Sequence, residues 1–315
     1  MFGILRKPAL TNLFLMLYLS IFGGAIGLFA KLSFVAFSPL ATIFFRILIS
    51  SLFFILILAW QKRIKSVFKT IFANWKQVLI LSFFGVGAAM IVGFVGLRHT
   101  SAINYGLIYN LSSIFILIFS LFFLGEKLKK LDIFLIVVAF IGADIIITNG
   151  KFYFNVLEAH IFGDLLVLIS AIGWALYSVL GAKFSRQNKE FDSLSINLGV
   201  FLFSLVVLTP IMFLSPSNGI NFPALNLKVI LGILGLSILS TAILFFLWLK
   251  FVDKEGGIWA TLISLSENLT GVLLPIIFLG ERLTVPIVAG GILMILAISG
   301  KELFGLCYKK DKAIN

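Results

Sequence analysis

Long apolar runs separated by short polar connections make up most of this sequence. A transmembrane helix needs about 20 mostly apolar residues, because the hydrocarbon core is about 30 Å thick and a helix rises about 1.5 Å per residue. A single run in lipid must satisfy its own backbone hydrogen bonds, which a helix does. The pattern therefore predicts an all-α integral membrane protein with ten transmembrane helices, at approximately 12–35, 40–60, 76–97, 101–124, 131–149, 161–183, 193–214, 229–251, 257–279 and 284–304.

The connections between these spans are short, and the longest are about 61–75 and 215–228, so little soluble domain is expected. The first apolar run follows Arg6 and Lys7 and is longer than the apolar part of a signal peptide, so we interpret it as the first span. Composition agrees, since 61% of the residues are hydrophobic and 12% are charged. A soluble domain has about 45–50% apolar and about 25% charged residues. Lipid must therefore be the solvent for most of the apolar surface.

The basic residues behind the net charge of +12 gather in short clusters at alternate connections. This is the pattern of loops that face an anionic cytoplasmic leaflet, and it differs from the continuous basic surface of a nucleic-acid-binding protein. The clustered side includes both ends of the chain. We expect a multi-pass protein of the inner (cytoplasmic) membrane, with both termini in the cytoplasm and no nucleic-acid partner.

Two segments of the first half return in the second half in the same order. Leu124–Leu128 (LGEKL) recurs as Leu279–Leu283 (LGERL), 155 residues later, and Phe22–Lys31 aligns with Trp174–Lys183 at a shift of 152. Such self-similarity indicates an internal repeat. The sequence thus divides into two five-helix repeats, at about 12–149 and 161–304, followed by a cytoplasmic tail at 305–315.

Five spans in each repeat is an odd number, which forces the two repeats into opposite orientations in the membrane. Inverted repeats of this kind form a solute site near the membrane midplane, between the halves. The pattern therefore predicts a carrier that moves a small solute by alternating access.

These motifs resemble those of the drug/metabolite transporter (DMT) superfamily, in its EamA-type branch. Each repeat of that family ends its fourth helix with an LGE-plus-basic signature, which here is Leu124–Lys127 and Leu279–Arg282. The family's second repeat often opens with Gly-Asp-Leu, as Gly163–Leu165 does here. The departures are Phe22-Gly23 in place of Trp-Gly and Glu267-Asn268 in place of Glu-Pro. The resemblance covers about 12–304 and implies the DMT/EamA fold and solute transport, with amino-acid export a frequent activity.

Glu267 is the sharpest candidate for solute chemistry, because it lies about midway along the ninth predicted span. An ionisable side chain inside the membrane costs about 2.5–3.5 kcal/mol on insertion scales and therefore marks a functional position. Ser264 and Asn268 share part of the polar face of that helix. We predict that these three residues bind a cationic or amine-bearing solute, or that Glu267 carries a coupling proton. The alternative is a structural Glu held by neighbouring helices.

Polar and aromatic side chains at matching depths complete the predicted solute site. Tyr109 and Ser112 share one face of the fourth span, and Trp174 and Tyr177 share one face of the sixth. Trp248 lies near the cytoplasmic end of the eighth, where a role in the interfacial aromatic belt competes with solute contact. We predict that all five contact the solute, with helix packing as the alternative.

Three further residues are predicted to serve gating or helix pairing. Arg46 lies near the outer end of the second span and Lys31 near the end of the first, where each either extends to the interface or pairs with another helix. Arg46 as an anion contact is the alternative. Pro275 lies inside the ninth span, where it removes a backbone donor and favours a kink that helps to switch access.

The energy source and the competing functions follow from motifs that the sequence lacks. It has no Walker A motif, so a proton, ion or solute gradient is expected to drive transport. Cys307, His99 and His160 lie apart, so no metal or other cofactor is predicted. An uptake carrier of the same fold is one alternative. A membrane-embedded lipid-modifying enzyme is another, but it would need a catalytic cluster at the interface, and the acidic residues are scattered.

Overall fold

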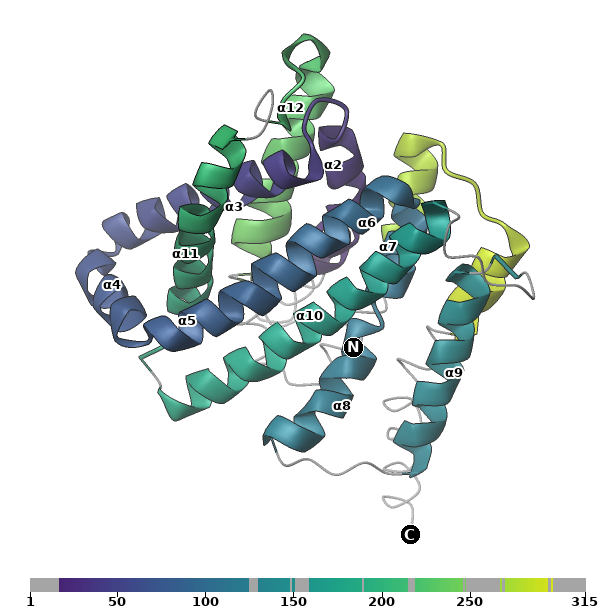
Figure 1. The fold of residues 1–315 in the computed structure, drawn as a ribbon, viewed down its shortest axis with the longest axis horizontal. Coiled ribbons are helices and arrows are strands. Elements are labelled where there is room, and N and C mark those ends of the chain that lie inside the picture. The colour runs from purple at the N-terminus through teal and green to yellow at the C-terminus, as the bar shows by residue number, and fades with distance from the viewer. Residues whose placement is uncertain are drawn as a thin grey trace, which may run out of the picture.

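The computed structural model describes residues 17–124, 130–147, 149–150, 159–188, 190–214, 219–245, 247, 267, 270–293 and 296. Regular structure in this part of the chain is helical, apart from one isolated antiparallel bridge between Phe37 and Ile220. The first helix, Leu17–Ser33, is interrupted at Ala25. The labelled elements of Figure 1 are α2 (Ile26–Ser33), α3 (Pro39–Trp60), α4 (Ile64–Ala73), α5 (Trp75–Ser82), α6 (Gly93–His99), α7 (Ala102–Tyr109), α8 (Ser112–Leu124), α9 (Lys130–Ile147), α10 (Ala159–Gln187), α11 (Ser193–Leu214) and α12 (Leu227–Leu234).

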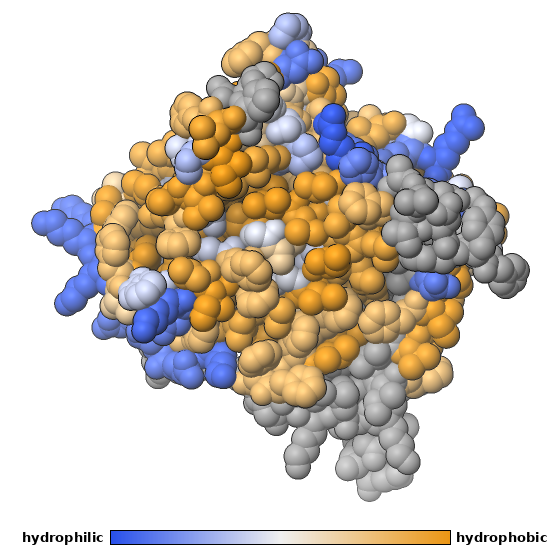
Figure 2. Space-filling view, viewed as in Figure 1, coloured by the Kyte–Doolittle hydropathy of each residue, from blue (hydrophilic) through white to orange (hydrophobic). Residues whose placement is uncertain are grey.

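Four helices are long and apolar enough to cross a membrane, and each coincides with a predicted span to within a few residues. They are Pro39–Trp60, Trp75–His99, His160–Ser185 and Ser193–Leu214. Shorter apolar helices also fall on predicted spans, at Leu17–Ser33, Ala102–Ile116, Leu227–Ile243 and Thr270–Leu279. Apolar side chains cover most of the face shown in Figure 2, and polar ones gather at its edges. This surface suits lipid, because a soluble monomer rarely exposes such large apolar patches.

Helices at equivalent places in the two halves have matching lengths and matching irregularities. The helices α3 and α11 both contain 22 residues. α5 continues into a π-helical segment, η1 (Phe83–Val92), and α12 continues into a second, η4 (Gly235–Ile243). Long π-helical segments are rare and occur mostly at functional sites. The shift of 152 residues that aligns the sequence motifs also superimposes η1 on η4, so the repeat extends to backbone geometry.

Each half packs its helices against the other half in the same pairings. α2 packs against α12, and α10 packs against η1 and α6, alongside which it runs in Figure 1. A serine hydroxyl joins the same spans in each half, since Ser240 of η4 donates to the Phe22 carbonyl of the first helix and Ser170 of α10 to the Ala89 carbonyl of η1, both at 2.6 Å. Hydroxyl-to-carbonyl bonds of this kind hold helices together where lipid removes the hydrophobic drive for association. The interface between the halves is therefore built from two related sets of contacts.

The connection between α3 and α5 contains a helix that was not predicted, because it has no long apolar run. α4 is amphipathic, since Val67 and Ile71 are buried while Lys65 and Lys69 on the same helix are exposed. It is too short to cross a membrane, and its mixed faces are typical of a helix lying along an interface. The basic connection at 61–75 is therefore ordered.

Candidate functional site

The fourth predicted span is broken in the middle, at Asn110 and Leu111, between α7 and α8. The Asn110 side chain donates to the Gly106 carbonyl at 2.7 Å and so caps the end of α7. Discontinuous helices are typical of the solute sites of membrane carriers. At this break the N–H groups of Asn110 and Leu111 stay hydrogen-bonded, to the Gly106 and Ile108 carbonyls at 3.3 and 3.0 Å. Tyr109 ends α7 and Ser112 begins α8, so two of the predicted solute contacts lie on either side of this break.

Beside the break, aromatic rings from both halves form a continuous group, the aromatic cluster, which consists of Tyr105, Tyr109, Trp174, Tyr177 and Phe245. Tyr105 stacks on Tyr109 with ring centroids 5.4 Å apart, and Tyr109 lies 6.3 Å from Trp174. Trp174 in turn contacts Tyr177 at 5.3 Å and Phe245 at 5.4 Å. The structure thus brings together three residues, Tyr109, Trp174 and Tyr177, that the sequence predicted separately.

Tyr177 is held at two places, its hydroxyl and its ring. Its hydroxyl donates to Asn197 Oδ1 of α11 at 2.7 Å. Its ring lies against Gly85 of η1, where a Cβ would come within 3.0 Å of Tyr177 Cε2. Glycine at position 85 is therefore what allows the ring to approach the first half so closely.

Glu267 lies against the first helix, at Gly23. A Cβ on Gly23 would come within 2.7 Å of Glu267 Cδ, so the glycine makes room for the carboxylate. One turn further on, Thr270 donates to the Ser20 carbonyl at 2.6 Å and fastens the two helices together. The carboxylate has no hydrogen bond or ion pair to any residue that the structure describes. The helix that carries Glu267 also contacts α7, since a Cβ on Gly106 would lie 3.7 Å from the Gly271 carbonyl oxygen, one turn after Glu267. This contact puts Glu267 near the aromatic cluster, which Tyr105 and Tyr109 of α7 begin.

Arg46 is buried, with 3% of its surface exposed. Its Nε donates to Thr241 Oγ1 of η4 at 2.7 Å, and its guanidinium lies over the Phe94 ring at 5.4 Å from the centroid. The Arg46–Thr241 bond joins the first half to the second. Arg46 therefore does not extend to the interface, which was one of the two roles expected of it.

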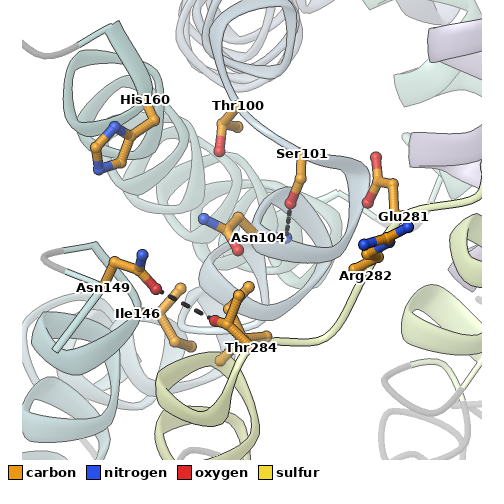
Figure 3. Close-up of a pocket in the computed structure, with 10 residues that line it drawn as sticks. Thr100, Ser101, Asn104, Ile146, Asn149, His160, Glu281, Arg282 and Thr284 are labelled. Atoms are coloured by element: carbon orange, nitrogen blue, oxygen red, sulfur yellow. Dashed lines mark hydrogen bonds between the residues drawn. The ribbon is translucent and has the colours of Figure 1, made fainter.

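A pocket of about 290 Å³, lined mostly by residues with polar side chains, lies at the start of α7, and Figure 3 shows its lining. Glu281 reaches this pocket from the second LGE signature and accepts from the Ala102 and Ile103 backbone N–H groups, at 2.8 and 3.0 Å. It is a charged cap on the N-terminus of a helix that belongs to the other half. Gly280 supplies the turn that precedes it, with a φ of 67° that favours glycine. This geometry explains the Gly-Glu pair of the signature in structural terms.

Behind the pocket, Asp164 is fully buried and accepts two hydrogen bonds from the first half. Thr100 Oγ1 donates to one oxygen at 2.5 Å and Asn104 Nδ2 to the other at 3.1 Å. Lys31 Nζ donates to the Thr100 carbonyl, so the first helix joins the same network. The partners of Asp164 lie on a different segment from its own helix, so this aspartate links the two halves.

The remaining predicted residues divide into two groups. Pro275 is buried within the helix Thr270–Leu279, and its carbonyl accepts from the Glu281 backbone N–H at 3.3 Å. Ser264, Asn268 and Trp248 lie outside the described residues. Thr241 and Phe245 were not predicted as site residues, because a threonine or phenylalanine in an apolar run carries no signal of its own.

Comparison with known proteins adds the family. The profile of the EamA-like transporter family matches residues 10–148 and again residues 161–300. The uncharacterized transporter YyaM of Bacillus subtilis (strain 168) is 29% identical over 291 residues, covering 91% of this chain and 92% of that protein. An uncharacterized transporter of Archaeoglobus fulgidus is 27% identical over 264 residues, covering 83% of this chain and 87% of its own.

A solved crystal structure has the same overall fold. It matches with a TM-score of 0.64 and 20% sequence identity, over 93% of this chain and 97% of the other. The family match covers each of the two halves whose helices correspond, and it extends over most of the sequence. The chain therefore belongs to the EamA-like transporter family.

Proposed function

We propose that this protein is a secondary transporter in which ten transmembrane helices form two inverted five-helix repeats, at about 12–149 and 161–304. It carries an amino acid or a related amine-bearing metabolite across the cytoplasmic membrane by alternating access, in the export direction. Both termini and the tail at 305–315 lie in the cytoplasm. Support comes from the corresponding helices of the two halves and from the paired contacts between them.

One observation carries the choice of solute, namely the Glu267 carboxylate beside the aromatic cluster. Its side chain has no hydrogen-bond or ion-pair partner among the described residues. It lies where the first helix contacts the start of the helix Thr270–Leu279. A carboxylate in low dielectric favours a cation strongly. An ammonium group on the solute supplies that cation, and the rings of the cluster receive an apolar or aromatic side chain.

A proton or another ion supplies the energy in this proposal, since Glu267 can exchange a coupling proton for the ammonium of the solute. The second candidate function is uptake of the same solute. It would use the same residues, and only the direction of the driving gradient would differ. Gly24 supports movement at this contact, because it lets the first helix approach Thr270 and Gly271 without a side chain between them.

The experiment is solute counterflow in proteoliposomes that contain the purified full-length protein. Labelled L-phenylalanine outside is measured with unlabelled L-phenylalanine inside, for wild type, Glu267→Gln and the control Glu190→Gln. Glu190 is exposed and outside the cluster, so its substitution removes the same charge without touching the site.

Wild type and Glu190→Gln are expected to show counterflow above that of protein-free liposomes, and Glu267→Gln is expected to show none. Full counterflow by Glu267→Gln would remove Glu267 from the mechanism. Absence of counterflow by wild type for phenylalanine and for a panel of other amino acids and amines would reject the proposed solute class.

A further inference from the structure

Arg46 is a buried cation with no carboxylate partner in the described part of the chain. Its exposed fraction is 3%, and the one ion pair among the described residues, Arg63–Asp192, lies at the surface, where both side chains are at least 40% exposed. Removing an arginine from water costs several kcal/mol unless an anion compensates the charge. An arginine in this situation is therefore a candidate site for an anion supplied from outside the protein.

The guanidinium is held in a fixed orientation by a single protein hydrogen bond. Thr241 Oγ1 donates its proton to the Leu236 carbonyl at 2.7 Å, within the π-helical segment η4, and so presents a lone pair to Arg46 Nε. A guanidinium has five N–H donors in one plane. No hydrogen bond joins the other four, on the two terminal nitrogens, to a described residue. The edge of the guanidinium that carries the two terminal nitrogens can donate two parallel hydrogen bonds to the two oxygens of a carboxylate.

The surroundings of this edge indicate what the carboxylate is attached to. Phe94 covers one face of the guanidinium at 5.4 Å. The Phe94 ring contacts Tyr105 edge-on with centroids 6.3 Å apart, and Tyr105 stacks on Tyr109. Both tyrosines belong to the aromatic cluster, and the helix that carries Glu267 contacts α7 between them, at Gly106. Arg46 and Glu267 form no ion pair with each other. Among the described residues, neither charge has a partner of opposite charge, and both lie on elements that pack around the cluster.

We infer that Arg46 is the carboxylate-binding residue of the solute site, and that the solute is a zwitterion with an apolar body. Its carboxylate binds the terminal nitrogens of Arg46, its apolar part packs in the aromatic cluster, and its ammonium faces Glu267. This inference rests on the proposed function and adds the anionic end of the solute to it. Because Thr241 belongs to the other half, the orientation of Arg46 also depends on how the halves are placed.

Three probes that share one phenyl ring separate the two charges. L-Phenylalanine carries both, phenethylamine carries the ammonium alone, and 3-phenylpropionate carries the carboxylate alone. Binding of each to purified protein in detergent is measured by titration calorimetry, for wild type, Arg46→Gln and Thr241→Val. The matched control is Arg63→Gln, which removes an exposed arginine far from the cluster.

Arg46→Gln is expected to weaken phenylalanine and 3-phenylpropionate about 10- to 100-fold, since a hydrogen bond to a charged group contributes about 1.5–3 kcal/mol and each 1.4 kcal/mol is about tenfold. Phenethylamine affinity is expected to stay unchanged. Thr241→Val keeps the charge but frees the guanidinium, so it shifts the same two affinities in the same direction by a smaller factor. It carries the test if Arg46→Gln does not fold. Arg63→Gln is expected to bind all three probes as wild type does.

An equal loss for all three probes, or an unchanged preference for phenylalanine over phenethylamine, would overturn the inference. If that preference is unchanged while Glu267-dependent counterflow persists, the inference fails and the proposed function stands. If 3-phenylpropionate binds in an Arg46-dependent way while no amine binds or moves, the proposed function fails and the carboxylate-binding role of Arg46 stands. If wild type binds none of the three probes, both are rejected.

Discussion

Glu281 stabilises the first turn of α7 from the opposite half of the protein, and its removal has a predictable local effect. The carboxylate accepts from Ala102 N at 2.8 Å and from Ile103 N at 3.0 Å. A hydrogen bond to a charged group contributes about 1.5–3 kcal/mol, and a helix cap contributes about 1 kcal/mol. Because Glu281 is partly exposed, we take about 2–3 kcal/mol for both bonds together. Glu281→Ala should therefore open this turn about 30- to 140-fold more often.

Amide hydrogen exchange of the protein in detergent measures this opening directly, because exchange at a protected amide follows the population of the open turn. The peptide that covers 101–109 is expected to exchange faster in Glu281→Ala by this factor. Glu281→Gln keeps one acceptor oxygen without the charge and should lie between wild type and the alanine variant. Glu190→Ala, on an exposed residue, is the control. Equal exchange in Glu281→Ala and wild type would refute the capping role and the structural account of the LGE signature.

Two further substitutions test packing at the site. Gly23→Ala places a Cβ within 2.7 Å of Glu267 Cδ and should abolish counterflow, whereas Gly87→Ala, whose Cβ meets nothing closer than 3.9 Å, should leave it intact; equal effects would contradict the close helix contact. Tyr177→Phe removes the 2.7 Å bond to Asn197 and should destabilise the protein by about 1–2 kcal/mol, seen as a lower midpoint of thermal unfolding in detergent. An unchanged midpoint would show that this bond contributes nothing.

Apolar runs predicted the helices well, because a span in lipid is specified by length and composition alone. The ends of α3 and α11 agree with the predicted spans to within one residue. The break at Asn110 was not predicted, since polar residues such as Asn110 and Ser112 do not by themselves end a transmembrane run, and the interruption depends on how α7 and α8 pack. The helix α4 could have been predicted from its sequence, because its apolar residues recur at helical spacing. It was missed because it lacks the long apolar run that marks a transmembrane span.

Single side chains of the site were predictable where polarity inside a span made them stand out, as for Glu267, Tyr109 and Trp174. Their partners were less predictable, because contacts between residues so far apart in the chain leave no local pattern. Thr241 is 195 residues from Arg46, and only the folded halves bring the two together. The LGE repeat was visible in sequence, yet its reason, a cap on a helix of the other half, required the structure.

In the proposed arrangement, two inverted halves enclose the solute site. Equivalent connections of the two repeats must then lie on opposite sides of the membrane, and this can be measured. Lys65 in α4 follows the second predicted span, and Phe222 follows the seventh, its equivalent in the other repeat; both are exposed. Single-cysteine variants Lys65→Cys and Phe222→Cys, each with Cys307→Ser, are labelled in intact cells with a membrane-impermeant maleimide. The cysteine at 222 is expected to react from outside, and the cysteine at 65 only after the membrane is permeabilised. Labelling of both positions from the same side would contradict inverted repeats and the site between them.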